Sequence, residues 1–192
     1  YRLEPSPLFI PRSIQEKYVT NKHKKYGEEK ETTFMKTLKG GVGNSQLQRD
    51  IAYYRIKHRL RMAMLYFYGE MKNYMILGTS NRSEKMTGLF VKYGDGASDL
   101  DPIAGLYKTQ VFELAKFLNV PRSIIEKAPT PDLAPGLTDE QTLNLSYEKL
   151  DIILAGLDMG MKKEDIAQEA GVEISSVDYV IQLMEVSWHM RN

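Results

Sequence analysis

Apolar residues recur at helical spacing through the second half of the chain and predict a series of amphipathic helices. The segment 106–120 has apolar residues at positions i, i+3, i+4 and i+7, namely Val111, Leu114, Ala115 and Leu118. Pro121 then opens a short helical turn. A further helix is capped by Ser146 and carries Leu150, Ile153, Leu154 and Leu157. Two more helices are predicted around residues 163–170 and 175–188.

An earlier apolar pattern predicts a helix that is followed directly by a strand. From Leu47 to about Tyr68, apolar residues recur near a spacing of 3.6, with Arg55 and Arg59 among the basic residues between them. The next apolar run, NYMIL, reads as a short buried strand that ends at Gly78. Helix, strand and polar loop in this order are typical of the α/β class with a parallel sheet.

Two loops interrupt these elements. The first, residues 78–102, is rich in glycine and charge, and it follows the predicted strand, where α/β proteins usually bind ligands. The second, residues 127–142, is rich in proline and leads into a capping box from Thr138 to Gln141. Long loops in compact domains are often functional, so we predict that the stretch Pro129–Gly136 is a mobile lid.

Composition narrows the class of protein. The chain has 192 residues, 42% apolar and 27% charged, with a net charge of +1, which gives no general attraction to nucleic acid or membrane. It contains no cysteine, which excludes a disulfide framework and a thiolate zinc site. No apolar run approaches the roughly 20 residues that span a bilayer. We therefore predict a single cytoplasmic domain.

Charge is unevenly distributed. Residues 1–49 carry ten Lys or Arg against five Asp or Glu, and they show little periodicity. We interpret this region as a solvated surface segment, with a phosphate-attracting or partner-binding arm as the alternative. Within it, the run GGVGNS at residues 40–45 lacks the Lys-Ser/Thr ending of a Walker loop and reads as a turn.

The loop after the strand contains the main candidates for chemistry, which are Thr79, Glu84, Lys92, Asp95 and Asp99. Carboxylates beside backbone amides and cations suit Mg²⁺ and phosphates, although a plain exposed loop has the same composition.

Two further patterns leave alternatives open. Arg55 and Arg59 share a helix face, where they could bind a phosphate or carboxylate of a ligand or form structural ion pairs. Residues 163–181 look like a helix-turn-helix, but their second helix has no Lys or Arg, so a plain helical hairpin is favoured.

Several ordered segments resemble the ammonia-dependent NAD⁺ synthetases, a family of N-type ATP pyrophosphatases. The segments are HRLRMAMLY, ILGTSNRSE, GLFVKYGDGASDLDPIAGLYKTQVFELAKFLNVP and KAPTPDL, and the resemblance covers roughly residues 44–192. It implies a Rossmann-like parallel sheet flanked by helices, in a cytoplasmic homodimer. It also implies amidation of deamido-NAD⁺ with ammonia through an adenylate, with ATP and Mg²⁺ and with no covalent nucleophile among the side chains.

Matching positions assign roles to individual residues. The resemblance implies that ATP is bound by Thr79, Lys108 and Thr130, and that Mg²⁺ is bound by Glu84. It implies that deamido-NAD⁺ is bound by Arg59, Lys92, Asp99 and His189. The family has a His-Lys pair at the last position, whereas here Met190 follows the histidine.

One family signature is not visible. The SGGxDS loop that wraps the ATP pyrophosphate should lie about a hundred residues before Thr79, and only 78 residues precede it here. We therefore expect the chain to be part of a longer protein. The alternatives are another N-type ATP pyrophosphatase with a different carbonyl substrate, and a non-catalytic module that binds nucleotide or dimerises.

Overall fold

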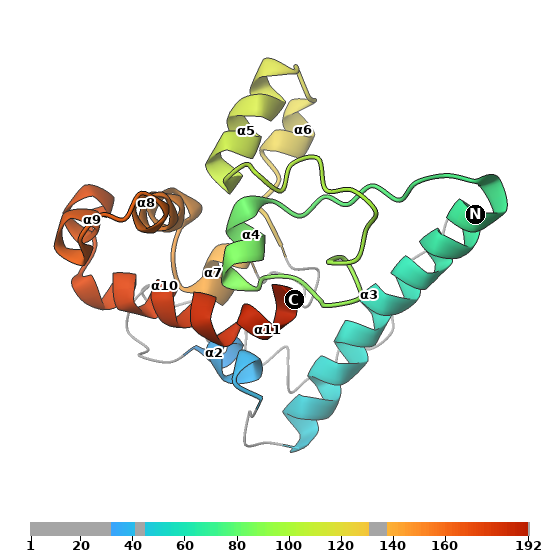
Figure 1. Ribbon diagram of the computed structural model, residues 1–192, viewed down its shortest axis with the longest axis horizontal. Helices are drawn as coiled ribbons and strands as arrows, with labels where there is room; N and C mark the ends of the chain where they lie inside the picture. Colours follow the sequence, from blue (N-terminus) through green and yellow to red (C-terminus); the bar gives the residue numbers. More distant parts are fainter. Residues whose placement is uncertain (1–31, 41–44, 131–137, 192) are drawn as a thin grey trace.

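The structure is a computed structural model that describes residues 32–40, 45–130 and 138–191. In these ranges the chain is mainly helical (Figure 1). The helices are α2 (Thr33–Leu38), α3 (Ser45–Lys72), α4 (Arg82–Thr87), α5 (Lys108–Phe117), α6 (Arg122–Ile125), α7 (Asp139–Leu143), α8 (Tyr147–Asp158), α9 (Lys163–Ala170), α10 (Ile174–Val186) and α11 (Trp188–Arg191). None of them combines the length and the apolar character needed to cross a membrane.

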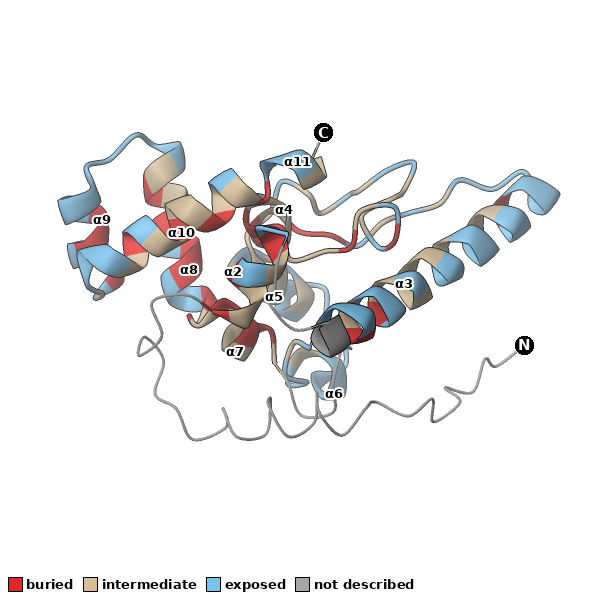
Figure 2. Cartoon of the chain, turned by 90° about the horizontal axis from the view of Figure 1, so that it is seen from below, coloured by how far each residue is buried: buried red, intermediate tan, exposed pale blue. Residues whose placement is uncertain are grey.

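The hydrophobic core lies among the C-terminal helices. Helices α8, α9 and α10 pack on one another and bury apolar faces that follow the predicted periodicity (Figure 2). The fully buried side chains include Leu150, Ile153, Leu154, Ile166, Val177, Val180 and Leu183. Gly171 ends α9 with a φ of +60°, a backbone conformation that glycine adopts without steric cost. The predicted helices at 163–170 and 175–188 are therefore confirmed, and they form a helical hairpin.

Helix α2 also contributes to this core. Its N-cap residue Thr32 accepts a hydrogen bond from the Met35 backbone N–H at 3.1 Å. Met35 and Leu38 are buried against the C-terminal helices. The prediction of a poorly patterned, solvated segment is therefore wrong for residues 32–38. These two apolar residues, one turn apart, fix this short helix through tertiary packing.

Helix α3 lies apart from the core, at the edge of the molecule (Figure 1). The helix predicted from Leu47 to Tyr68 is confirmed, and it is longer than predicted. Many of its apolar side chains are exposed, including Ile56, Leu60, Met64, Leu65, Phe67, Tyr68 and Met71. An apolar surface of this extent is typical of a helix that packs against something outside the described residues.

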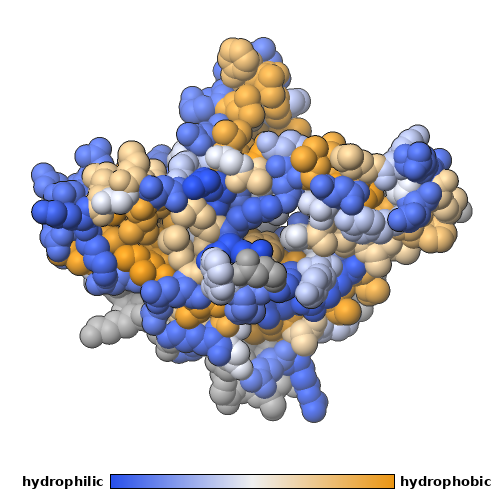
Figure 3. Space-filling model, in the orientation of Figure 1, coloured by the Kyte–Doolittle hydropathy of each residue, from blue (hydrophilic) through white to orange (hydrophobic). Residues whose placement is uncertain are grey.

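Helix α5 is confirmed where the apolar spacing predicted it, but it buries no residue fully. Hydrophobic side chains gather over α5 and α6 at the top of the molecule in Figure 3. They include Phe117, which is 81% exposed, and Ile124, which is 63% exposed. The predicted caps are present nearby, since Pro121 precedes α6 and the capping box from Thr138 to Gln141 starts α7.

In the run NYMIL, Asn73 forms a turn with a φ of +54°, and residues 74–77 are extended but mostly exposed. The prediction of a buried strand is wrong in that respect. Leu77 forms an isolated parallel bridge with Leu100, and no longer strand occurs within the described ranges. Tyr74, Met75 and Leu77 are each at least 60% exposed. Burial of a strand depends on neighbours that are distant in sequence, and no described residues cover this one.

Candidate active site

The extended segment after α3 positions the first candidate loop. The Gly78 backbone N–H donates to the Leu100 carbonyl at 2.8 Å, and the Asp99 N–H donates to the Ile76 carbonyl at 3.0 Å. A Cβ atom at Gly78 would lie 1.8 Å from Asp101 Oδ1 and 2.9 Å from Ser98 Cβ, so a larger residue would have to displace both side chains. These hydrogen bonds therefore fix the positions of Thr79 and of the first residues of α4.

Glu84 is held by the N-terminus of α4. Asn81 caps this helix by accepting a hydrogen bond from the Glu84 N–H at 3.0 Å, and Glu84 Oε2 accepts from the Asn81 N–H at 3.2 Å. The second carboxylate oxygen, Oε1, lies 3.2 Å from Lys108 Nζ. Both side chains of this pair are only 17% exposed. The capping box thus orients one oxygen inward, toward a cation.

Lys108 begins α5, and its backbone is fixed to α4. Its N–H donates to Ser83 Oγ at 2.9 Å. Its ammonium group lies 5.4 Å from the centre of the Tyr147 ring, within the range of a cation–π interaction. An ammonium group placed in this way can neutralise a phosphate without moving far.

These residues line one cavity of about 460 Å³, which lies between α3, the 79–95 loop, α5 and α7. All four residues that the resemblance assigned to ATP and Mg²⁺ contribute to it, namely Thr79, Glu84, Lys108 and Thr130. They come from segments spread over more than fifty positions of the chain. A cavity of this volume lies in the usual range of small-molecule sites.

Asp139 is a lining residue that the sequence interpretation missed. It is 5% exposed, and its Oδ2 accepts a hydrogen bond from the Tyr147 hydroxyl at 2.9 Å. Its Oδ1 is buried without a hydrogen-bond partner among the described residues. Burial raises the pKa of this carboxyl, although the Tyr147 hydrogen bond and the Lys108 charge oppose the shift. The only sequence signal was its place in the capping box.

Asp95, a candidate from the glycine-rich loop, also lines this cavity. Its Oδ1 accepts from the Val91 N–H at 2.8 Å and lies 3.4 Å from His58 Nδ1. This carboxylate therefore closes the turn that follows Val91 and links it to α3, which accounts for its presence without a ligand.

Three of the four residues assigned to deamido-NAD⁺ form a connected chain outside this cavity. Arg59 Nε donates to the Lys92 carbonyl at 3.1 Å, and Lys92 Nζ donates to the His189 carbonyl at 2.6 Å. His189 Nδ1 lies 3.0 Å from the Val186 carbonyl oxygen. The structure thus brings together residues from α3, the loop and α11.

The fourth, Asp99, lies on the other side of the loop. Its Oδ2 accepts from the Ile76 N–H at 2.7 Å, and its Oδ1 accepts from the Tyr66 hydroxyl at 3.2 Å. In this arrangement it joins the end of α3 to the extended segment. The run at residues 41–44 of GGVGNS and most of the predicted lid, residues 131–136, lie outside the described residues.

A metal ion at this cavity would need ligands beyond the described side chains. Among the described residues, no three His, Asp or Glu side chains lie close enough together to hold one. Glu84 and Asp139 are nevertheless close enough to interact electrostatically, and Oδ1 of Asp139 has no hydrogen-bond partner among the described residues. Mg²⁺ accepts one or two carboxylates with phosphate oxygens and water, so this donor set fits the ion when a nucleotide is present.

Known proteins resemble the chain over most of its length. It is 46% identical over 185 residues to the NH₃-dependent NAD⁺ synthetase of Thermotoga maritima, which covers 96% of this chain and 63% of that protein. It is 54% identical over 118 residues to the enzyme of the same name from Coprothermobacter proteolyticus, covering 62% of this chain and 40% of the relative. The chain therefore spans less than two thirds of the length of these relatives.

Solved structures of two synthetases also resemble the chain. The NMN synthetase from Francisella tularensis matches with a TM-score of 0.63 and 34% identity, over 74% of this chain and 55% of that one. An NH₃-dependent NAD synthetase from Campylobacter jejuni, solved in complex with a nitrate ion, matches with a TM-score of 0.59 and 25% identity, over 83% of this chain and 59% of that one.

The family match extends further toward the N-terminus than the resemblance from motifs suggested. The NAD synthase family model matches residues 14–192, rather than only residues from 44 onward. The match includes α2 and every residue that lines the cavity. The chain belongs to the NAD synthase family.

Proposed function

We propose that the protein amidates deamido-NAD⁺ with ammonia to give NAD⁺, using ATP and releasing AMP and pyrophosphate. The observation that carries the proposal is the convergence of Thr79, Glu84, Lys108 and Thr130 on one 460 Å³ cavity. The family supports the reaction type, and the relatives named NH₃-dependent NAD⁺ synthetases support the substrate.

In the first step, a nicotinate carboxylate oxygen forms a bond to the α-phosphorus of ATP. The bond from that phosphorus to the bridging oxygen breaks, and pyrophosphate leaves with the electron pair. Two anions must approach each other, so the barrier depends on neutralising their charge and on holding them in line. Lys108 is the described cation that lines the cavity at α5, and Thr79 and Thr130 provide hydroxyl groups for orientation.

In the second step, ammonia attacks the activated carbonyl carbon, AMP departs, and the new amide nitrogen loses a proton. No side chain needs to form a covalent bond in either step. The protein contributes position, exclusion of water and a fixed electrostatic environment.

Glu84 and Asp139 are the carboxylates that would hold Mg²⁺ beside the nucleotide. When bound, the ion supplies positive charge to the phosphate oxygens. Glu84 pairs with Lys108 in the structure. We infer that the carboxylate exchanges this partner, at least in part, when nucleotide arrives, which frees the ammonium group for a phosphate.

The dinucleotide would lie along Arg59, Lys92 and His189, with Asp99 at the other side of the loop. Support comes from the connected contacts that join the first three residues. Met190 replaces the lysine of the family at the end of this row, so we expect fewer ionic contacts there than in relatives that keep the lysine.

We further propose that the protein is a cytoplasmic homodimer and that the Leu77–Leu100 bridge belongs to a larger Rossmann-like parallel sheet. The exposed apolar residues of α3 support an intersubunit role for that helix. The parallel direction of the bridge and the exposed side chains of Met75 and Leu77 support the larger sheet.

A mononucleotide is the second candidate substrate, because a solved structure that resembles this chain is named an NMN synthetase. The relatives with higher identity favour the dinucleotide. The full-length protein should be assayed with ATP, Mg²⁺ and ammonium, and with either deamido-NAD⁺ or nicotinate mononucleotide.

We expect NAD⁺, AMP and pyrophosphate in equal amounts, and a kcat/KM for deamido-NAD⁺ at least about 10-fold above that for the mononucleotide, a difference of about 1.4 kcal/mol. The reverse preference would identify a mononucleotide synthetase. Release of no pyrophosphate with either substrate would favour a non-catalytic module. Pyrophosphate release with another carboxylate only would identify a different member of the superfamily.

A further inference from the structure

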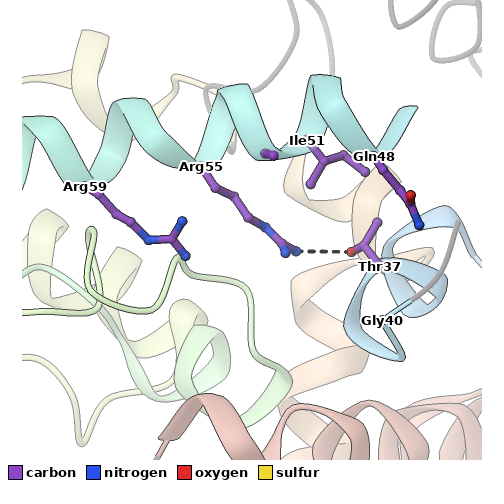
Figure 4. Close-up of a pocket in the computed structure, with 7 residues that line it drawn as sticks. Thr37, Gly40, Gln48, Ile51, Arg55 and Arg59 are labelled. Carbon is purple, nitrogen blue, oxygen red and sulfur yellow. Dashed lines mark hydrogen bonds between the residues drawn. The ribbon is translucent and has the colours of Figure 1, made fainter. Parts of the chain in front are cut away.

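A second cavity of about 340 Å³ lies beside the first, between α2 and the N-terminal half of α3 (Figure 4). Thr37, Ile51 and Arg55 line both cavities, so the two meet at these residues. Arg55 and Arg59 project into this space from one face of α3 (Figure 4). The described residues that line it include no Asp or Glu.

The positive charge of Arg55 is disfavoured in this cavity by burial and by the nearby charge of Arg59. Its guanidinium is half-buried, and its hydrogen bond to Thr37 Oγ1 is long, at 3.4 Å. Burial is the main cause that lowers the pKa of Arg55, and repulsion from Arg59 adds to it. An arginine nevertheless remains charged in such surroundings, and a bound anion would stabilise this partly buried charge.

The acidic side chains of the neighbouring cavity do not meet this need. The Glu84 carboxylate forms an ion pair with Lys108. The Asp95 carboxylate lies beside the His58 ring, and the Asp139 carboxylate accepts a hydrogen bond from the Tyr147 hydroxyl. Among the described residues, the salt bridges shorter than 4.0 Å do not include Arg55. A structural ion pair was the alternative explanation for Arg55 and Arg59, and the described residues do not provide one.

We propose that the smaller cavity binds a phosphate group, with Arg55 as its principal ligand and Arg59 as a second cation. A guanidinium presents parallel N–H donors that match two phosphate oxygens, and the Thr37 hydroxyl and the Gln48 amide can serve the others. Arg59 was expected to touch the dinucleotide, whereas Arg55 has no role in that set. The site therefore adds a ligand position beyond the proposed substrate contacts.

Two sources could supply the phosphate. One is a phosphate of the bound dinucleotide, which would extend from the Arg59 and Lys92 row into this cavity. The other is a free inorganic anion that binds independently. The shared chemistry is recognition of a tetrahedral phosphate anion by paired guanidinium groups. Binding of free phosphate does not depend on the proposed amidation.

The test is calorimetric titration of the full chain with inorganic phosphate, in chloride buffer at constant ionic strength. The variants are Arg55→Gln and Arg59→Gln. Arg49→Gln is the matched control, because Arg49 is an exposed arginine on the same helix that does not line the cavity. Each charge-assisted contact should be worth about 10-fold or more in Kd.

We expect Arg55→Gln to raise the Kd for phosphate at least about 10-fold and Arg49→Gln to change it less than about 2-fold. The Tm without phosphate should not fall in Arg55→Gln, because the substitution removes a half-buried charge that Arg59 repels. Unchanged phosphate affinity in Arg55→Gln, or an equal loss in the Arg49 control, would overturn the proposal. A lower Tm with unchanged affinity would show a structural role instead.

A competition titration separates the two sources. If deamido-NAD⁺ displaces phosphate from the wild type and Arg55→Gln raises the Kd for the dinucleotide, the phosphate belongs to the substrate. If phosphate binds with equal affinity when the dinucleotide is saturating, the site takes a free anion. Either result supports a phosphate site at Arg55, and no saturable phosphate binding up to about 50 mM would contradict it.

Discussion

The pair between Glu84 and Lys108 gives the most specific prediction. Glu84→Gln keeps an amide oxygen for the capping contact with the Asn81 N–H and removes only the charge that faces Lys108. The two side chains are 17% exposed and 3.2 Å apart, so their attraction is less screened than that of a surface pair. We expect a coupling energy of about 1–2 kcal/mol from a double-mutant cycle with Lys108→Met.

The assay is urea denaturation at neutral pH for the wild type, both single variants and the double variant. Lys116 and Glu113 provide the matched control, because their side chains form an exposed pair at 2.7 Å with exposures of 59% and 72%. The same cycle there should give only about 0.2–0.5 kcal/mol. Equal coupling in the two cycles would refute the idea that the Glu84 pair is held in a partly desolvated cavity.

The same substitution should also affect catalysis. If Glu84 helps to hold Mg²⁺ at the nucleotide, Glu84→Gln should slow pyrophosphate release at limiting Mg²⁺ by at least about 10-fold, equivalent to about 1.4 kcal/mol. Glu113→Gln should retain the wild-type rate. Near-wild-type turnover in Glu84→Gln would remove Glu84 from the metal site.

Three further predictions concern the lid, helix α3 and Asp139. Protease cleavage within residues 129–136 should slow when ATP is added, whereas equal cleavage with and without nucleotide would count against a lid. Light scattering at micromolar concentration should show a dimer that buries well over about 1,000 Å² through α3, and a fully active monomer would contradict this. The pKa of Asp139 is raised above its ordinary value of 3.8, so its ionised form destabilises the native state. The free energy of unfolding should therefore fall as pH rises from about 3.8 through the raised pKa, and Asp139→Asn should reduce this slope; an unchanged slope would contradict the shift.

Local patterns predicted most of the helices. The apolar spacing of α5, α8, α9 and α10 is complete within each segment, so neighbouring residues suffice to identify them. Helix α2 was missed because Met35 and Leu38 are buried by the C-terminal helices, which are distant in sequence. The exposure of Leu77 was missed for the opposite reason, since an apolar run alone does not show whether other strands flank it.

The sequence predicted some residues of the candidate site and missed others. The family resemblance selected Thr79, Glu84, Lys108 and Thr130, and the structure places all four on one cavity. Asp139 escaped notice because its burial and its hydrogen bond with Tyr147 arise only when the chain has folded and the first residues of α7 and α8 meet. The two interpretations of Arg55 could not be separated by spacing, since the sequence does not show which charges lie near it in space.

Amide hydrogen exchange of the full chain, with and without Mg²⁺ and a non-hydrolysable ATP analogue, would show whether ATP binds in the 460 Å³ cavity. We expect slower exchange in residues 79–88 and 107–112, which carry Thr79, Glu84 and Lys108. Helix α9 does not line the cavity and should be unaffected. Protection of α9 without protection of the two cavity segments would contradict ATP binding in this cavity.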